Sequence, residues 1–215
     1  MPAAMPSTAL HLLRPSGQPR GAVLVIPSCW GRTPSFADYA GRLAAAGFSA
    51  GVSDIHEGRT ARTEAEAREL KAARRREPVY KGLLRDIEAL RAETGAERIG
   101  VVGFSKGAHW AVWLSQQAGN RVASAVLYYC ARGGDFSASR AAYLAHFAEA
   151  DAWVSRTARA GMERALARAG RPYLALDYPG TGHWFAESDR ARDYVPEAAE
   201  RAFAETVAHF GRTLA

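Results

Sequence analysis

Short apolar runs alternate along the chain with longer segments whose apolar residues recur at helical spacing. The strand-like runs lie at 22–26, 48–53, 98–103, 122–128, 142–148 and 173–177, with a weaker one at 8–13. The segments between them predict helices at 36–46, 63–76, 80–94, 106–118, 154–169 and 196–212. Pro78 is expected to separate the second of these helices from the third. Strands that alternate with helices predict an α/β fold with a mostly parallel sheet covered on both faces.

A single domain is expected over residues 1–215. The chain shows no internal repeat, no low-complexity linker and no shift in composition that would mark a boundary. Its 215 residues, of which 48% are hydrophobic and 23% charged, suffice to bury a full core. We find no leader segment and no transmembrane run, so we expect a soluble cytoplasmic protein. The sequence leaves the oligomeric state open, with a monomer as the default expectation.

The net charge of +6 does not by itself indicate a nucleic-acid partner. The arginines are scattered along the predicted helices among acidic residues, and the one cluster, Arg74–Arg76, fits a solvated helix face. Cys29 and Cys130 form neither a disulfide framework nor a metal-ligand spacing. We therefore expect no nucleic-acid or membrane partner and no metal site.

The strand-like run at 98–103 ends in Gly103-Phe-Ser105-Lys-Gly107, a G-x-S-x-G arrangement followed at once by a helical pattern. A serine on so sharp a turn needs neighbours without side chains. Cβ atoms at Gly103 and Gly107 would collide with the adjoining strand and helix. The pattern is typical of a nucleophile elbow and predicts that Ser105 is a catalytic nucleophile.

A serine hydroxyl becomes a good nucleophile when a base removes its proton and a third group orients that base. Asp151 follows a predicted strand, and His183 lies in a glycine-rich loop after the last strand. Both loops should open at the same carboxyl edge of the sheet as Ser105. The order serine, acid, histidine along the chain is the one expected with such an elbow. We predict Ser105, Asp151 and His183 as a catalytic triad.

Each of these assignments has an alternative within the sequence. His109 stands one helical turn beyond Ser105 and would line the site, but the helix rather than a loop would fix its direction. Asp135 and Glu149 are alternatives for the acid, and Asp151 can also be read as a plain helix cap. The remaining histidines that we considered lie in regular elements and are read as structural: His11, His146 and His209.

An oxyanion intermediate needs backbone donors close to the nucleophile. The Lys106 amide follows Ser105 at the start of a helix, and the Cys29 amide lies in a loop after an early strand. Three tryptophans stand beside the catalytic elements, where they either line an apolar pocket or pack in the core: Trp30, Trp110 and Trp184.

Taken together, these residues resemble the dienelactone hydrolase family of α/β-hydrolases over nearly the whole chain. The resemblance lies in four stretches: Val25-Ile-Pro-Ser-Cys-Trp-Gly31, Val101-Val-Gly-Phe-Ser-Lys-Gly-Ala108, His146-Phe-Ala-Glu-Ala-Asp151 and Tyr178-Pro-Gly-Thr-Gly-His-Trp-Phe-Ala186. It implies an α/β-hydrolase fold and an ester or lactone hydrolase that uses neither a metal nor an organic cofactor.

The sequence departs from the family pattern at two places. The best-known members carry a cysteine at the elbow and a glutamate in the early loop that restrains the thiol, whereas here these positions are Ser105 and Ser28. The family also uses arginines to grip a substrate carboxylate. Arg76 falls near one such position, but Glu187 carries the opposite charge after the histidine motif. We expect the side chains of Ser28, Arg76 and Glu187 to face the substrate. The negative charge of Glu187 should then disfavour an anionic dienelactone.

The sequence thus predicts a serine hydrolase that cleaves a small carboxylic ester, lactone or thioester through an acyl-enzyme. The alternatives are a non-catalytic binding or regulatory protein of the same fold, and an acyltransferase. Helices 63–76 and 80–94 either cap the site or only cover the sheet, and the pattern does not decide between these arrangements.

Overall fold

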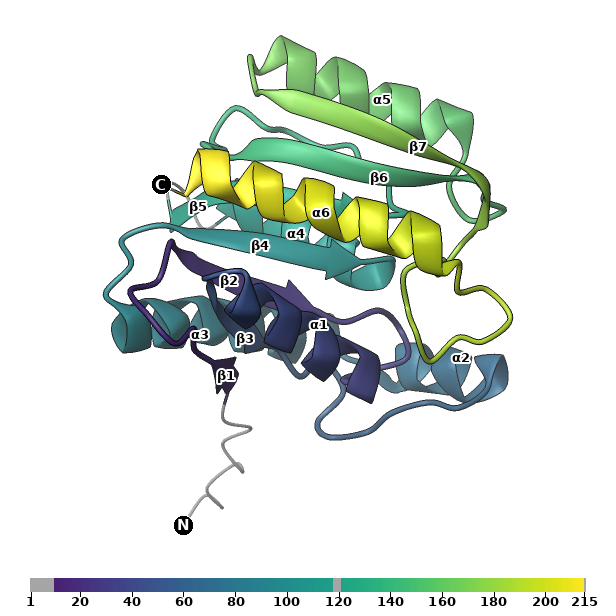
Figure 1. The fold of residues 1–215 in the computed structure, drawn as a ribbon. Coiled ribbons are helices and arrows are strands. Elements are labelled where there is room, and N and C mark those ends of the chain that lie inside the picture. Colours follow the sequence, from purple (N-terminus) through teal and green to yellow (C-terminus); the bar gives the residue numbers. More distant parts are fainter. Residues whose placement is uncertain (1–9, 118–120, 215) are drawn as a thin grey trace.

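The computed structural model describes residues 10–117 and 121–214 (Figure 1). The first predicted strand falls partly outside these ranges. The described strands are β1 His11–Leu13, β2 Ala22–Ile26, β3 Ser49–Val52, β4 Ile99–Phe104, β5 Val122–Tyr128, β6 Ala142–Ala150 and β7 Tyr173–Gly182. The described helices are α1 Pro34–Ala45, α2 Glu64–Ala73, α3 Arg76–Thr94, α4 Lys106–Gln117, α5 Arg156–Arg168 and α6 Pro196–Thr213.

The strands form one sheet in the order β1-β3-β2-β4-β5-β6-β7. Every neighbouring pair is parallel except β1 and β3, which are antiparallel. The central strands β2, β4 and β5 are buried along their whole length, as their uninterrupted valine-rich sequences require. The predicted α/β fold with a mostly parallel sheet is confirmed.

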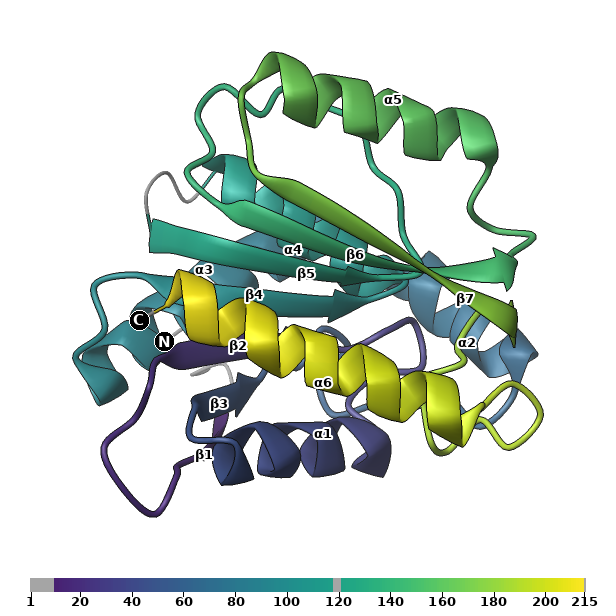
Figure 2. The same ribbon diagram turned by 45° about the horizontal axis from the view of Figure 1, so that its top comes forward.

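Helices cover both faces of this sheet (Figures 1 and 2). On one face Leu24 and Val101 pack with the apolar residues of α3, α4 and α5. On the other face Val25 and Val102 pack with those of α1 and α6, and with Leu70 of α2. Side chains alternate along a strand, so neighbouring residues serve different cores. None of the helices in the described ranges is long and apolar enough to cross a bilayer.

Most element boundaries lie within two residues of the sequence prediction, and two differ by more. The break between α2 and α3 falls at 74–75 instead of at Pro78, which lies in the first turn of α3. A proline is harmless there because the N–H it lacks would have no helical partner. Strand β7 also runs on to Gly182, beyond the predicted end at Asp177, because its last residues still pair with Ala148 and Ala150 of β6.

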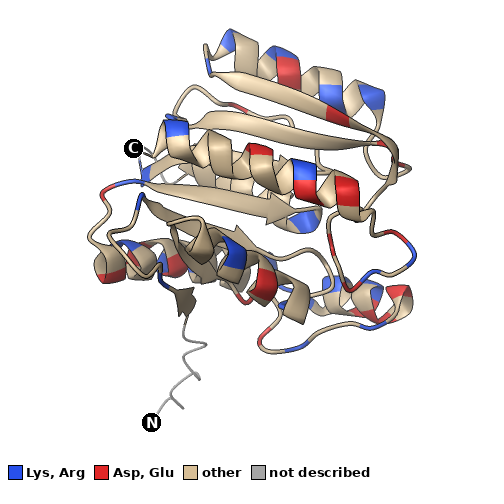
Figure 3. Ribbon diagram, in the orientation of Figure 1, with Lys and Arg blue, Asp and Glu red and all other residues tan. Residues whose placement is uncertain are grey.

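The carboxyl ends of the parallel strands converge at one edge of the sheet, where α2 and the loop after β7 also lie (Figure 1). Strands β5 and β6 are joined by residues 129–141, a connection without a helix. Basic and acidic residues are intermixed on the helices, and the strands carry few of either (Figure 3). The fold therefore concentrates loops and side chains of several elements at one sheet edge.

Candidate active site

The turn between β4 and α4 has the strained geometry that its glycines allow. Ser105 adopts a left-handed backbone with φ 49°. A Cβ atom at Gly103 would lie 2.4 Å from the Ala108 nitrogen, and one at Gly107 would lie 2.1 Å from the Ile26 carbonyl oxygen. Both positions therefore require glycine, and the serine is held at the tip of the turn, where its amide donates to the Tyr128 carbonyl at 3.0 Å.

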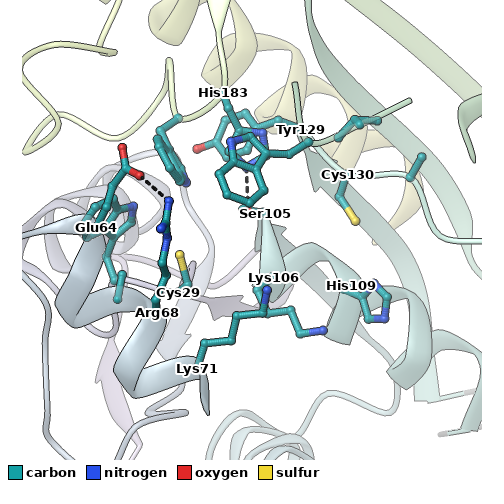
Figure 4. Close-up of a pocket in the computed structure, with 16 residues that line it drawn as sticks. Cys29, Glu64, Arg68, Lys71, Ser105, Lys106, His109, Tyr129, Cys130 and His183 are labelled. Carbon is teal, nitrogen blue, oxygen red and sulfur yellow. Dashed lines mark hydrogen bonds and ion pairs between the residues drawn. The ribbon is translucent and has the colours of Figure 1, made fainter. Parts of the chain in front are cut away.

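The structure brings Ser105, His183 and Asp151 into one hydrogen-bonded chain. Ser105 Oγ lies 2.7 Å from His183 Nε2 (Figure 4). On the other side of the ring, His183 Nδ1 lies 2.8 Å from Asp151 Oδ2. The imidazole and the carboxylate are 7% and 5% exposed, so solvent competes little for these contacts. In this arrangement the imidazole can take the serine proton while the carboxylate fixes the tautomer.

Asp151 is held by a second set of bonds at its other oxygen. Oδ1 accepts from the amides of Trp153 at 2.8 Å and Val154 at 3.2 Å. These bonds close a turn before α5, whose N-cap is Ser155, so the reading of Asp151 as a plain helix cap is wrong. The same carboxylate holds this turn and contacts His183. The alternative acids lie elsewhere: Asp135 is exposed and accepts from the Ser137 amide, and Glu149 is exposed and accepts from the Gly180 amide.

A cavity of about 470 Å³ opens above Ser105, and aromatic side chains form one side of it. Trp30 and Trp184 meet edge to face at 5.2 Å, and the Tyr129 ring packs 4.9 Å from the His183 ring. Trp153, which is 58% exposed, stands at the rim beside Trp184. Of the four described non-glycine residues with a left-handed backbone, Ser105, Tyr129 and Trp184 all line this cavity, so strain concentrates at the site.

Cations occupy the other side of the cavity. Lys71 from α2 and Lys106 from α4 line it, and Figure 4 shows Lys71 extending toward Lys106. Arg74 and Arg132 lie close enough to act on the Lys106 charge. We call Lys71, Arg74, Lys106 and Arg132 the cationic cluster. Among the described residues no carboxylate forms an ion pair with any of them, whereas Arg68 at the cavity edge is paired with Glu64.

This crowding of like charges shifts the pKa values of the cluster and its neighbours. Burial, and then the charges of Arg74, Lys71 and Arg132, lower the pKa of Lys106 to about 8. Burial and the same basic surroundings lower the pKa of His109 to about 3, so this imidazole is neutral at physiological pH. His109 lines the cavity, as its position one turn after Ser105 suggested, but the hydroxyl of Ser105 is hydrogen-bonded to His183 instead.

Four residues expected to contact substrate do not line the cavity: Ser28, Arg76, Trp110 and Glu187. Arg76 begins α3 and is exposed to solvent. Trp110 is 2% exposed and packs against Tyr80, while Arg74 and Lys106 lie over its ring at 5.4 and 5.6 Å. Trp110 is therefore a core residue whose ring packs against two members of the cationic cluster.

Glu187 and Ser28 pair with each other in the protein interior. Ser28 Oγ donates to Glu187 Oε2 at 2.8 Å, and the Tyr129 hydroxyl donates to Glu187 Oε1 at 2.9 Å. Both Ser28 and Glu187 are fully buried. The expectation that Glu187 faces the substrate and repels an anion is therefore wrong, because the turn after Trp184 directs its side chain inward.

The sequence pattern left open whether α2 caps the site, and none of its cavity-lining residues was predicted. Glu64, Ala67, Arg68 and Lys71 all line the cavity, so α2 caps the site while α3 contributes none of the lining. Their spacing of three, four and seven positions marks one helix face, which was a readable signal. Tyr129 and Cys130, which follow β5, were also missed, although residues that follow a parallel strand lie at this same edge.

No group of three or more histidine, cysteine, aspartate or glutamate side chains within residues 10–117 and 121–214 is arranged to hold a metal ion. The polar groups at the cavity include Ser105 with its two hydrogen-bonded partners and the lysines of the cationic cluster.

Comparison with known proteins identifies relatives of this arrangement. The model of the dienelactone hydrolase family matches residues 9–214. A curated relative from Bradyrhizobium sp., named "Probable 2-oxo-3-(5-oxofuran-2-ylidene)propanoate lactonase", is 28% identical over 203 residues, covering 86% of this chain and 81% of the relative.

Solved structures share the fold. A dienelactone hydrolase from Anabaena variabilis ATCC 29413 matches with a TM-score of 0.67 and 20% identity, over 95% of this chain and 91% of that one. A dienelactone hydrolase-like promiscuous phosphotriesterase from metagenomic libraries matches with a TM-score of 0.79 and 17% identity, over 92% and 88%. With the family model spanning nearly all of the sequence, the chain belongs to the dienelactone hydrolase family and is a hydrolase that acts on a lactone or ester.

Proposed function

We infer that the protein is a carboxylic ester hydrolase that cleaves a small lactone or ester through an acyl-enzyme on Ser105. We further infer that the substrate bears a carboxylate. The observation that carries this inference is the unbroken hydrogen-bonded chain from Ser105 through His183 to Asp151 at the base of a cavity. Each member has the partner that its role requires.

The reaction then proceeds in two halves. Ser105 Oγ bonds to the substrate carbonyl carbon as its proton passes to His183 Nε2, and the carbonyl π electrons move onto the oxygen. When the oxyanion collapses, the bond to the leaving oxygen breaks and His183 returns the proton to that oxygen. In a lactone the leaving oxygen remains part of the acyl group, so the ring opens. Water then attacks the acyl carbon as its proton passes to His183. The bond from this carbon to Ser105 Oγ breaks, His183 returns the proton to Oγ, and the carboxylic acid is released.

The amides of Lys106 and Cys29 are the proposed donors to the oxyanion. Lys106 is the first residue of α4, so its amide has no partner within the helix and the helix dipole favours negative charge there. Cys29 lies in the turn after β2 and lines the same cavity. A backbone donor of this kind contributes about 3 kcal/mol of transition-state stabilisation.

The cationic cluster supports a carboxylate on the substrate. Lys71 and Lys106 face the cavity without a paired acid among residues 10–117 and 121–214, and a carboxylate would complement their charge. The name of the Bradyrhizobium relative describes an anionic lactone, a propanoate. Glu187, the one feature that argued against an anion, is buried behind the site.

Matched substrates test this proposal. We expect hydrolysis of a five-membered enol lactone that bears a carboxylate, and a kcat/KM about tenfold or more lower for its methyl ester, which lacks the charge. A fluorophosphonate probe should label the protein and should not label Ser105→Ala. A folded protein that neither hydrolyses the lactones nor takes the label would refute the serine mechanism, and equal rates on both lactones would refute the carboxylate preference alone.

A further inference from the structure

One buried carboxyl group joins three parts of the candidate active site. Glu187 lies four residues after His183 in the same loop and is fully buried. One of its oxygens accepts from Ser28 in the turn after β2, and the other accepts from Tyr129 at the end of β5. No lysine, arginine or histidine in the described part of the chain forms an ion pair with it.

Packing alone does not account for a carboxyl group at this position. A buried acid without a cationic partner is destabilising relative to an apolar side chain of the same volume. Burial raises the pKa of Glu187 to about 8, which reflects this penalty. The arrangement is therefore explained by what the carboxyl group holds and not by what it contributes to the core.

The Ser28 contact fixes the turn that carries Cys29. Ser28 Oγ accepts from the Trp30 amide at 3.4 Å, and the Ser28 carbonyl accepts from the Gly31 amide at 3.2 Å. Ser28 thus makes the bonds that close this turn, and its hydroxyl proton is directed to Glu187. Moving Ser28 would move the adjacent Cys29 amide.

The Tyr129 contact fixes the ring that backs His183. Tyr129 has a left-handed backbone with φ 39°, and its amide donates to the His146 carbonyl at 2.7 Å. Its ring packs against the His183 ring, and its hydroxyl is directed to Glu187. The same carboxyl group therefore anchors one hydroxyl from the oxyanion side of the site and one from the histidine side.

We propose that Glu187 is a positioning residue of the active site, which holds the Cys29 turn through Ser28 and the His183 ring through Tyr129. This inference rests on the proposed serine mechanism, in which the Cys29 amide and His183 both act on the reacting carbonyl. Glu187 itself touches neither the substrate nor the reacting atoms.

Two substitutions separate this role from packing. Glu187→Leu keeps the volume roughly but removes both acceptors, and we expect kcat to fall about 30-fold with little change in KM, because a misplaced oxyanion donor weakens only the transition state. Glu187→Gln retains two polar contacts with the freely rotating hydroxyls, and we expect it to restore kcat to within about threefold of wild type. To exclude an effect of inactive protein, kcat is calculated per active site, and the active sites are counted by titration with a fluorophosphonate.

Tyr129→Phe and Tyr143→Phe provide a matched pair. Each removes one buried phenolic hydroxyl, but the Tyr143 hydroxyl is bonded to Ser115 and Ser139 at 2.7 Å each, away from the cavity. We expect both variants to lower the melting temperature, and only Tyr129→Phe to lower kcat, by about fivefold.

The affinity for a transition-state analogue can be measured independently of the stability of the protein. An alkyl boronic acid forms a tetrahedral adduct on the serine, so Glu187→Leu should weaken its inhibition by the same factor as kcat/KM. If Glu187→Leu lowers only the melting temperature and leaves kcat per titrated site and boronate affinity unchanged, the positioning role is wrong. If wild-type protein is neither labelled nor active, the serine mechanism itself fails, which is a distinguishable result.

Discussion

The two sides of the cavity are built on different principles. On the serine side nearly every functional polar group has a partner, from Ser105 through His183 to Asp151 and from Ser28 and Tyr129 to Glu187. On the cationic side, Lys71 and Lys106 face the cavity with no paired acid among the described residues. One side is complete without a ligand, and the other is not.

This difference separates orientation from recognition. Paired groups lose their freedom before substrate arrives, which is what a chemical step requires of a nucleophile and its base. Unpaired cations held close together repel one another, and an anion relieves that repulsion when it binds. We therefore expect changes on the serine side to act mainly on kcat and changes on the cationic side to act mainly on KM.

Removal of the nucleophile should have the largest effect. Ser105→Ala deletes the attacking oxygen, and we expect kcat to fall by about 10⁴-fold or more. The cationic side is untouched, so the ring-opened product should still bind with an affinity within a few-fold of that measured for wild type. Steady-state kinetics and calorimetric titration with the product check the two halves. A loss of both turnover and binding would break the separation between the two sides.

The acid of the triad is tested by an isosteric change. Asp151→Asn presents an amide where His183 Nδ1 needs an acceptor, and we expect kcat to fall by about 10³- to 10⁴-fold because the histidine takes the wrong tautomer. Asp135→Asn is the control, since this exposed carboxylate caps only Ser137. A comparable loss in Asp135→Asn would show that the acid had been assigned to the wrong residue.

The three triad candidates that the structure brings together share one property, which is that strand ends determine their position. Ser105, Asp151 and His183 each follow a strand of a parallel sheet, so locating the strands also locates their side chains at one edge. The glycines of the elbow add a steric requirement that is local in sequence. The fold class was predictable for the same reason, because alternating strand and helix patterns have few topological solutions.

The wrong predictions concern residues whose role depends on the direction in which the side chain points. Strand order does not determine that direction. Trp110 lies five positions after Ser105 and so about 140° around the helix, whereas His109, at four positions, lies on the serine face. That difference was readable from helical geometry. Glu187 was read as facing the substrate because it is charged, but a turn of the loop directs it to Ser28, and no sequence pattern shows that turn.

A matched set of lysines tests the cationic side. The lysines of the chain are Lys71, Lys81 and Lys106, and Lys81 is paired with Glu77 on the solvent-exposed face of α3. Lys71→Met should raise KM for a carboxylate-bearing lactone about tenfold, with a smaller effect on kcat, because one charge-assisted contact is lost. Lys81→Met should leave KM within experimental error. Equal effects of the two changes would mean that general surface charge, and not the cavity, attracts the substrate.

The smallest expected effect is a pH dependence with a different origin on each side. Burial and neighbouring cations lower the pKa of Lys106 to about 8. Burial raises the pKa of Glu187 to about 8, against the lowering effect of the hydrogen bonds from Ser28 and Tyr129; the Asp189 charge raises it further and the Arg190 charge lowers it. As pH rises through 8 the lysine loses its positive charge and the glutamate gains a negative one. The first change should raise KM for an anionic lactone severalfold.

The second change should lower kcat, because negative charge behind the Cys29 turn opposes the developing oxyanion. The Cys29 thiol already reports this field, since its pKa is raised to about 11 by burial and, next, by the Glu187 charge. In Glu187→Gln the fall in kcat above pH 8 should disappear while the rise in KM remains, and in Lys106→Met the reverse should hold. Parallel changes of kcat and KM in both variants would show that the two sides titrate as one unit. The separate hydrogen bonding of Glu187, and the lack of an ion pair to Lys106 in the described part of the chain, argue against that result.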